Sequence, residues 1–134
     1  MLITREVDYA VRIVRDLNRG GRKKIDEICL NETIPRQFSY KILKKLEQAG
    51  IVKIFRGAGG GYCLEKNTSE ISLYDILYCI NNNPLLSECL QKGYNCPLNG
   101  KDGKPCGIHF ELERIQSNTF NQLKEKSLAE LCQG

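Results

Sequence analysis

The sequence predicts a mainly α-helical protein with one small β-hairpin wing: a winged helix-turn-helix followed by a long C-terminal dimerisation helix. Three observations support this fold class. Two short amphipathic helices fill residues 25–49, a glycine-rich hairpin follows at 51–64, and an apolar stripe runs through 108–126. We expect three parts, which are a winged helix-turn-helix domain at 1–82, a cysteine-rich loop at 83–107, and the dimerisation helix with its tail at 108–134.

Composition and charge narrow the class of partner. The chain has 134 residues, and residues 1–64 carry 13 Lys and Arg against 7 Asp and Glu. This basic half favours an anionic partner, with nucleic acid first, over a merely solvated surface. No apolar run approaches membrane-spanning length, and the N-terminus MLITREVDYA places charges where an export signal has its apolar core. We therefore expect a cytoplasmic protein that does not enter a membrane.

The first predicted helix covers residues 4–18. Thr4 is suited to cap it, and Gly20-Gly21 ends it. Its apolar residues follow helical spacing and form one inward stripe, made of Val7, Ala10, Val11, Val14 and Leu17.

Residues 25–49 form two predicted helices. The first, IDEICLNE, turns Ile25, Ile28 and Cys29 inward, and Pro35 starts the second, which Gly50 ends. The inward residues of the second helix are Phe38, Ile42, Leu43 and Leu46. Its outward residues are Arg36, Gln37, Tyr40, Lys41, Lys44, Lys45 and Gln48.

This pair of helices fits a helix-turn-helix, although an ordinary helical hairpin with a solvated face has a similar pattern. The next segment favours the DNA-binding interpretation. Two β-rich runs at 51–56 and 62–64 flank a glycine-rich tip, and a hairpin directly after a recognition helix is a wing. We expect double-stranded DNA as the partner, with Lys and Arg on phosphates and Gln37 and Tyr40 first on bases. The full set of predicted DNA contacts is Arg36, Gln37, Tyr40, Lys41, Lys44 and Arg56.

Two further helices complete the pattern. Residues 72–81 open with Ser72 and Asp75, spaced as a capping box, and Ser127 with Glu130 repeats this spacing near the end of the chain. The helix at 108–126 carries an apolar stripe with no partner in the chain, so we expect a homodimer. That stripe consists of Ile108, Leu112, Ile115, Thr119 and Leu123.

The loop from Cys89 to His109 contains four side chains that can bind a metal ion or a cluster. It holds three cysteines and the only histidine, among Gly and Pro residues that exclude a helix. Clustered cysteines in a reducing compartment favour metal or redox chemistry, and thiolate with imidazole suits zinc or an iron–sulfur cluster. The remaining cysteines lie within predicted helices or strands and are expected in the core; they are Cys29, Cys63, Cys79 and Cys132.

Together these parts resemble the bacterial winged-helix regulators of the IscR, NsrR and RirA type (the Rrf-two family). The most specific pieces are RGAGGGYCL at 56–64 and the three cysteines before the long helix; VDYAVR and the terminal SLAEL also match. The resemblance implies a homodimeric, cytoplasmic transcription factor on a palindromic operator. In cluster-bearing members, one iron–sulfur cluster per subunit lies near the dimer interface and tunes operator binding.

The resemblance carries the family's three cysteine ligands over to Cys89, Cys96 and Cys106. The fourth is a histidine in IscR-like members, matched by His109, or an acid from the partner's first helix in NsrR-like members, matched by Asp8. Six residues separate the first two cysteines and nine the last two, more than is usual in the family. A 2Fe–2S and a 4Fe–4S cluster both stay open.

Two other site chemistries fit the same fold. The thiols would sense oxidation directly if nearby lysines stabilise their thiolates. A structural zinc site would use the same Cys₃His set, although the usual close pair of zinc ligands is missing. An enzyme is not expected, because the sequence has no CxxC motif and offers no nucleophile–base pair.

Overall fold

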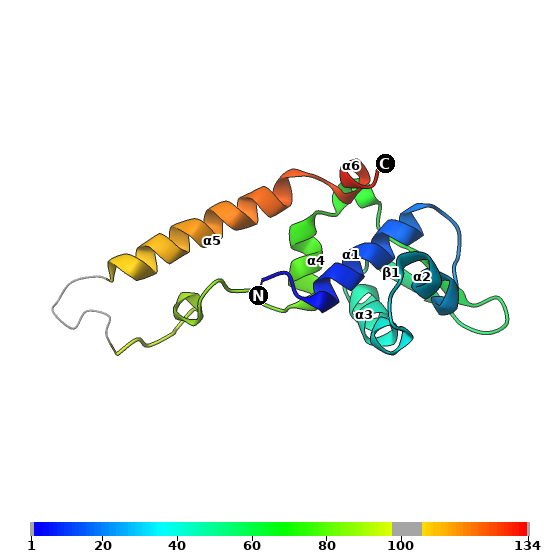
Figure 1. The fold of residues 1–134 in the computed structure, drawn as a ribbon, viewed down its shortest axis with the longest axis horizontal. Coiled ribbons are helices and arrows are strands. Elements are labelled where there is room, and N and C mark those ends of the chain that lie inside the picture. Colours follow the sequence, from blue (N-terminus) through cyan, green and yellow to red (C-terminus); the bar gives the residue numbers. More distant parts are fainter. Residues whose placement is uncertain (1, 98–105, 134) are drawn as a thin grey trace.

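The computed structural model describes residues 2–97 and 106–133 (Figure 1). Its elements are α1 (Arg5–Asn18), α2 (Ile25–Glu32), α3 (Arg36–Gln48), β1 (Val52–Phe55), β2 (Gly61–Leu64), η1 (Thr68–Glu70), α4 (Leu73–Ile80), η2 (Glu88–Leu90), α5 (Gly107–Glu125) and α6 (Leu128–Leu131). The two η elements are short 3₁₀ turns that the sequence did not predict. The predicted fold class, mainly helical with a two-stranded antiparallel hairpin, is confirmed.

Helix α1 is the centre of the core. It contacts α2, α3, α4 and β2, and Figure 1 shows it among these elements. Its inward side is almost fully apolar, because residues spaced three or four apart share one helix face. Ile13 and Tyr9 join the predicted stripe, and both are buried. The surrounding elements bury Ile28, Ile42, Leu43, Leu46, Val52, Ile76 and Leu77 against it.

The predicted helix ends are confirmed. Thr4 Oγ1 accepts the Val7 amide at 3.4 Å, which satisfies one open donor of the first turn of α1. Ser72 and Asp75 form a complete capping box at the start of α4. Gly50 ends α3 with φ of 76°, a conformation that side chains other than glycine resist.

One predicted core position on α3 is wrong. Phe38 is 40% exposed, whereas the neighbouring Ser39 is fully buried. The Ser39 hydroxyl donates to the Pro35 carbonyl at 3.3 Å and lies 3.1 Å from Cys29 Sγ, so its polar atom is satisfied inside. Phe38 packs at the edge of the core instead, with its ring 6.1 Å from that of Tyr9.

The wing is a regular antiparallel pair. Val52 lies opposite Leu64, and Phe55 lies opposite Gly61. The loop between α1 and α2 adds a third strand-like segment, because Lys23 and Tyr62 exchange both backbone hydrogen bonds at 2.8 and 2.9 Å. The wing is therefore fixed to the helical body along one edge.

Helix α5 leaves this body, as Figure 1 shows. None of its residues, all of which the structure describes, is buried. Only its last turns reach the core, through Phe120 and Leu123. The chain then returns: the Leu128 amide donates to the Ile71 carbonyl at 2.7 Å, and the Leu128 side chain is buried.

Two buried carboxylates join α1 to α2. The Asp16 and Glu32 side chains are 0% and 3% exposed. Asp16 Oδ1 lies 3.0 Å from both Arg19 Nη1 and Lys23 Nζ. The Arg15 guanidinium donates to both Glu32 oxygens. Each buried negative charge therefore has the opposite charges and donors that its burial requires.

We expect Asp16→Asn to lower the free energy of unfolding by about 3 kcal/mol, because it removes one partner of a buried charge network. Urea denaturation followed by circular dichroism measures this change. Glu111→Gln is the control, since it breaks only the exposed pair with Arg114 on α5 and should leave the midpoint unchanged. Equal midpoints for wild type and Asp16→Asn would contradict the structural role of the network.

Candidate nucleic-acid interface and cysteine site

The exposed face of α3 carries most of the side chains predicted for DNA contact. The exposed residues are Arg36, Gln37, Tyr40, Lys41 and Lys44. The Arg36 guanidinium donates to Tyr40 Oη at 3.0 Å and pairs with Asp26 Oδ1 at 3.0 Å. These contacts hold Arg36 and Tyr40 side by side at the start of the helix, where a recognition helix meets base edges.

Glu6 of α1 bridges two lysines of α3. Its carboxylate lies 3.1 Å from Lys41 Nζ and 3.4 Å from Lys45 Nζ. Burial by itself would raise the pKa of Glu6, but hydrogen bonds and charge from the two lysines outweigh it and hold this pKa below its ordinary value. This bridge was not predicted, because its partners lie in different helices.

Lys45 also joins α3 to the end of α4. Its ammonium donates to the Ile80 carbonyl at 3.2 Å, and the Cys79 thiol donates back to the Lys45 carbonyl at 3.3 Å. A cation near the last carbonyls of a helix interacts favourably with the helix dipole. The recognition helix is thereby fixed to the point where the chain enters the cysteine-rich segment.

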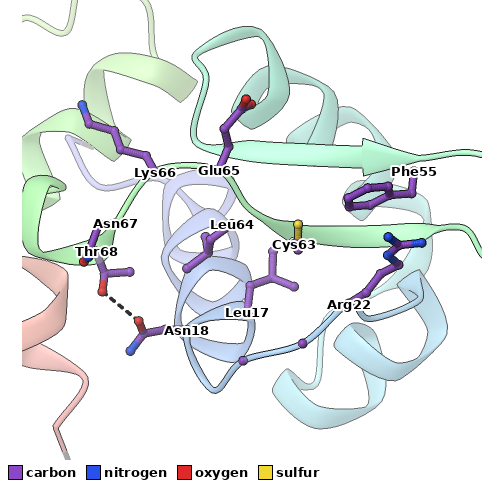
Figure 2. Close-up of a pocket in the computed structure, with 12 residues that line it drawn as sticks. Leu17, Asn18, Arg22, Phe55, Cys63, Leu64, Glu65, Lys66, Asn67 and Thr68 are labelled. Atoms are coloured by element: carbon purple, nitrogen blue, oxygen red, sulfur yellow. Dashed lines mark hydrogen bonds between the residues drawn. The ribbon is translucent and has the colours of Figure 1, made fainter.

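The wing presents Arg56 at the start of its tip, exposed as predicted. Behind the wing lies a hollow of about 680 Å³, between the hairpin and the end of α1 (Figure 2). Leu17, Leu64 and Phe55 line it, and the Thr68 hydroxyl donates to Asn18 Oδ1 at 2.7 Å on its rim. In Figure 2 the Arg22 side chain lies beside the Phe55 ring at one end of this hollow.

The structure brings the predicted cysteine ligands and the histidine to one cavity. Cys89, Cys96, Cys106 and His109 line a space of about 120 Å³, together with Tyr94 and Ile108. Cys89 comes from η2, Cys106 caps α5, and His109 lies in the first turn of α5. Residues 98–105 of the predicted loop lie outside the described residues. The sequence did not identify Tyr94 as part of this site.

In the described ranges 2–97 and 106–133, no three Cys, His, Asp or Glu side chains come close enough to hold a single metal ion. An iron–sulfur cluster differs from a single metal ion in the ligand spacing that it requires. Each iron of the cluster has its own protein ligands, so these ligands surround several atoms and not one point.

The two candidate fourth ligands differ in their surroundings. His109 is a wall of the cavity, with Nε2 3.9 Å from Glu113 Oε2 and the ring edge-on to Phe110. Asp8 is absent from the cavity wall of its own chain and forms an ion pair with Arg12 at 2.9 Å. His109 therefore lies at the cavity of its own subunit, whereas Asp8 was predicted to reach a cluster only from the partner subunit.

Among the described residues, a hydrogen bond and a packing contact join the cysteine-rich segment to α5. Gln116 Oε1 accepts the Leu86 amide at 2.7 Å, and η2 also packs on α5. Gln116 was not predicted, because it lies outside the apolar stripe of α5. The segment that carries Cys89 thus follows the position of α5.

The other four cysteines were expected in the core, and all four are only half-buried. Cys29, Cys79 and Cys132 pack against the core, whereas Cys63 lines the hollow behind the wing. Burial raises the pKa of Cys79, partly offset by the charge of Lys45, and burial raises the pKa of Cys132 as well. A raised pKa lowers the fraction of thiolate, which is the nucleophilic and metal-binding form of cysteine.

Known proteins resemble this chain in sequence over nearly its whole length. A family model described as Rrf2, iron-dependent transcriptional regulator, matches residues 3–134. Protein aau3 of Rhizobium meliloti is 31% identical, over 98% of this chain and 84% of its own. A protein of Haemophilus influenzae, named as a candidate HTH-type transcriptional regulator, is 34% identical over 98% of this chain and 86% of its own.

Two solved structures share the fold. Oxidised Staphylococcus aureus CymR matches with a TM-score of 0.73 and 20% identity, over 100% of this chain and 98% of its own. T. potens IscR matches with a TM-score of 0.72 and 21% identity, over 96% of this chain and 83% of its own. Separately, no helix in the described residues is long and apolar enough to span a membrane.

The exposed basic face of α3, the wing and the family match agree with one another. The relatives are transcriptional regulators and not enzymes, as the sequence predicted. This chain therefore belongs to the Rrf2 family of winged helix-turn-helix, DNA-binding transcriptional regulators.

Proposed function

We propose that this regulator is a homodimer whose operator binding responds to an iron–sulfur cluster held by Cys89, Cys96, Cys106 and His109. The observation that carries the proposal is the single cavity that these four side chains line. The proposal divides the chain into a DNA-binding part at 1–82, a cluster-binding loop at 83–107 and a dimerisation helix with its tail at 108–134. A regulator of this kind would act in the cytoplasm, where the DNA is.

The residues present fit such a group. Three thiols and one imidazole supply the donors that iron–sulfur clusters take, including histidine as a ligand. Tyr94 and Ile108 line the cavity beside these donors, and these two residues are 42% and 72% exposed. The bound cluster would supply an iron centre that is sensitive to iron supply, redox state or nitric oxide. Both 2Fe–2S and 4Fe–4S clusters fit this donor set.

The protein offers a route from this cavity to the DNA-binding surface. Gln116 ties the cysteine-rich segment to α5, and α5 packs on α4. The end of α4 is held by Lys45 of the recognition helix. A shift of α5 or of its preceding loop would therefore change the spacing of two recognition helices in a dimer, which must match DNA half-sites.

The exposed apolar residues of α5 support the dimer. Ile108 is 72% exposed, Phe110 55% and Ile115 38%, on a helix that projects from the body. Water contact at these side chains is unfavourable, and a second copy would cover them. The predicted partner for this face is therefore the same helix region of another subunit.

Direct thiol oxidation is the second candidate, since one neighbour of the same fold was solved in an oxidised form. It needs the same cysteines but no metal. A zinc site is less well supported, because the sequence lacks the close pair of ligands that zinc sites usually have. Visible absorption and metal analysis of anaerobically purified protein separate all three.

The first prediction concerns the cluster ligands. Replacing Cys89, Cys96 or Cys106 with Ser should give colourless, iron-poor protein after anaerobic purification, because the cavity offers no other thiolate. Cys63→Ser is the matched control and should keep its colour, since Cys63 lines the hollow behind the wing. A colourless wild-type protein would contradict the cluster, and its metal content would then distinguish zinc from bare thiols.

The fourth ligand gives a separate prediction. His109→Cys should keep a cluster with a lower reduction potential, because thiolate adds negative charge at the iron, and His109→Ala should leave a labile cluster. Absorption spectra and iron release to a chelator measure both. If His109→Ala is spectrally silent while Asp8→Ala perturbs the cluster, the fourth ligand comes from the partner's first helix.

The dimer is tested at Ile115. Ile115→Glu should give monomers in sedimentation equilibrium, because it would bury a charge in the interface at a cost of several kcal/mol. Ser117→Glu is the control: it adds the same charge on the opposite side of α5, two residues later, and should leave the dimer intact. A monomeric wild type would refute the proposed assembly.

DNA contact by α3 is tested through salt dependence. Lys44→Ala should weaken binding to all duplexes and reduce the slope of log K against log salt by about 0.9, as the loss of one phosphate contact does. Replacing Gln37 should change sequence preference more than affinity. Lys126→Ala, just after α5, removes the same charge outside α3 and the wing and should keep the wild-type slope. Unchanged binding by both α3 variants would contradict the assignment.

A further inference from the structure

We propose that Arg22 positions the wing for DNA contact and does not itself contact DNA. The inference rests on the proposed contact between the wing and DNA, and it adds a residue that the basic composition alone would have assigned to phosphate binding. Arg22 lies in the loop between α1 and α2, next to Lys23 and Lys24.

The Arg22 side chain holds the wing at two points. Its guanidinium carbon lies 3.5 Å from the centre of the Phe55 ring, which is close stacking contact. Its Nη1 group donates to the Gly59 carbonyl in the wing tip. Phe55 ends β1 and Gly59 lies four residues later, so the two contacts fall on either side of Arg56. Figure 2 shows Arg22 beside the Phe55 ring.

The backbone near Arg22 fits closely against the wing. Lys23 exchanges two hydrogen bonds with Tyr62, at 2.9 Å from its amide and 2.8 Å to its carbonyl. A Cβ added at Gly61 would lie 2.9 Å from the Lys23 carbonyl oxygen and 3.0 Å from Arg22 Cγ, and Gly61 has φ of 137°. Only glycine allows this approach, which places the Arg22 side chain along the hairpin.

A glycine-rich tip needs such a contact. Residues 57–61 contain four glycines and one alanine, so the tip has great conformational freedom when nothing holds it. Ordering a loop during association opposes binding, and holding it beforehand removes that cost. Arg22 supplies this contact, because one face of its guanidinium stacks on the Phe55 ring and one N–H group donates to the Gly59 carbonyl. Arg56, by contrast, is exposed at the tip and suited to reach a phosphate or a minor groove.

Two measurements separate positioning from phosphate contact. The first is amide hydrogen exchange at Gly60 in the free protein, whose N–H donates to the Gly57 carbonyl at 2.9 Å within the tip. The second is the salt dependence of binding to a duplex that the wild-type protein selects from random-sequence DNA. We compare Arg22→Ala with Arg22→Lys, and use Arg56→Ala as the control.

Arg22→Ala should accelerate amide hydrogen exchange at Gly60 by about tenfold. The lost stacking contact and charged hydrogen bond together stabilise the closed tip by roughly that factor. The same substitution should also weaken DNA binding without changing the salt slope. Arg22→Lys should not restore either property, since lysine keeps the charge but loses the flat stacking surface. Arg56→Ala should leave exchange unchanged and reduce the slope by about 0.9.

Several results would overturn the inference. A reduced slope with unchanged exchange in Arg22→Ala, or full rescue of binding by lysine, would make Arg22 a phosphate contact. Faster exchange without weaker binding, or no change in either property, would remove its positioning role. If instead Arg56→Ala binds DNA as the wild type does, the wing lies outside the DNA interface, and the inference fails through its premise.

Discussion

The burial of Asp16 and Glu32 is the constraint on which the arrangement of the DNA-binding part depends. A carboxylate removed from water is very unfavourable unless opposite charges and donors surround it. Arg15 of α1 and Arg19, which directly follows α1, reach Glu32 of α2, and Asn31 donates to both oxygens of Asp16. These contacts are directional, so they fix α2 on α1 more narrowly than apolar packing does. The turn and the recognition helix follow directly from α2.

Lys23 extends the same constraint to the wing. Its ammonium, on a side chain only 12% exposed, donates to both the backbone and the carboxylate of Asp16. Its backbone pairs with Tyr62 of β2. The recognition helix and the wing therefore take their positions from one pair of acidic side chains, although they are separated in sequence. Replacing such a network with apolar residues can preserve stability, so its contribution here is chiefly to geometry.

The sequence predicted what is local or periodic. The helix ends at Thr4, Gly50 and Ser72 were correct because each depends on residues within one turn. Cys89, Cys96, Cys106 and His109 line one cavity, and their role as ligands stays a prediction. The carboxylate network escaped prediction, because Asp16 and Glu32 look like ordinary polar residues near helix ends. The prediction placed Phe38 in the core, because hydrophobicity alone does not show which face of α3 points inward. A serine, Ser39, lies on that inward face.

The ion pairs on the recognition helix bear on how this protein searches a genome. Glu6 holds Lys41 and Lys45, and Asp26 holds Arg36, so much of the positive charge of α3 is already neutralised by its own chain. Fewer counterions are then released on arbitrary DNA than the count of basic residues suggests, which weakens non-specific binding. Phosphate contacts contribute to binding at operators and at other sites alike, so these ion pairs weaken the electrostatic part of both. The carboxylates beside the helix thus lower the net positive charge that α3 presents to any duplex.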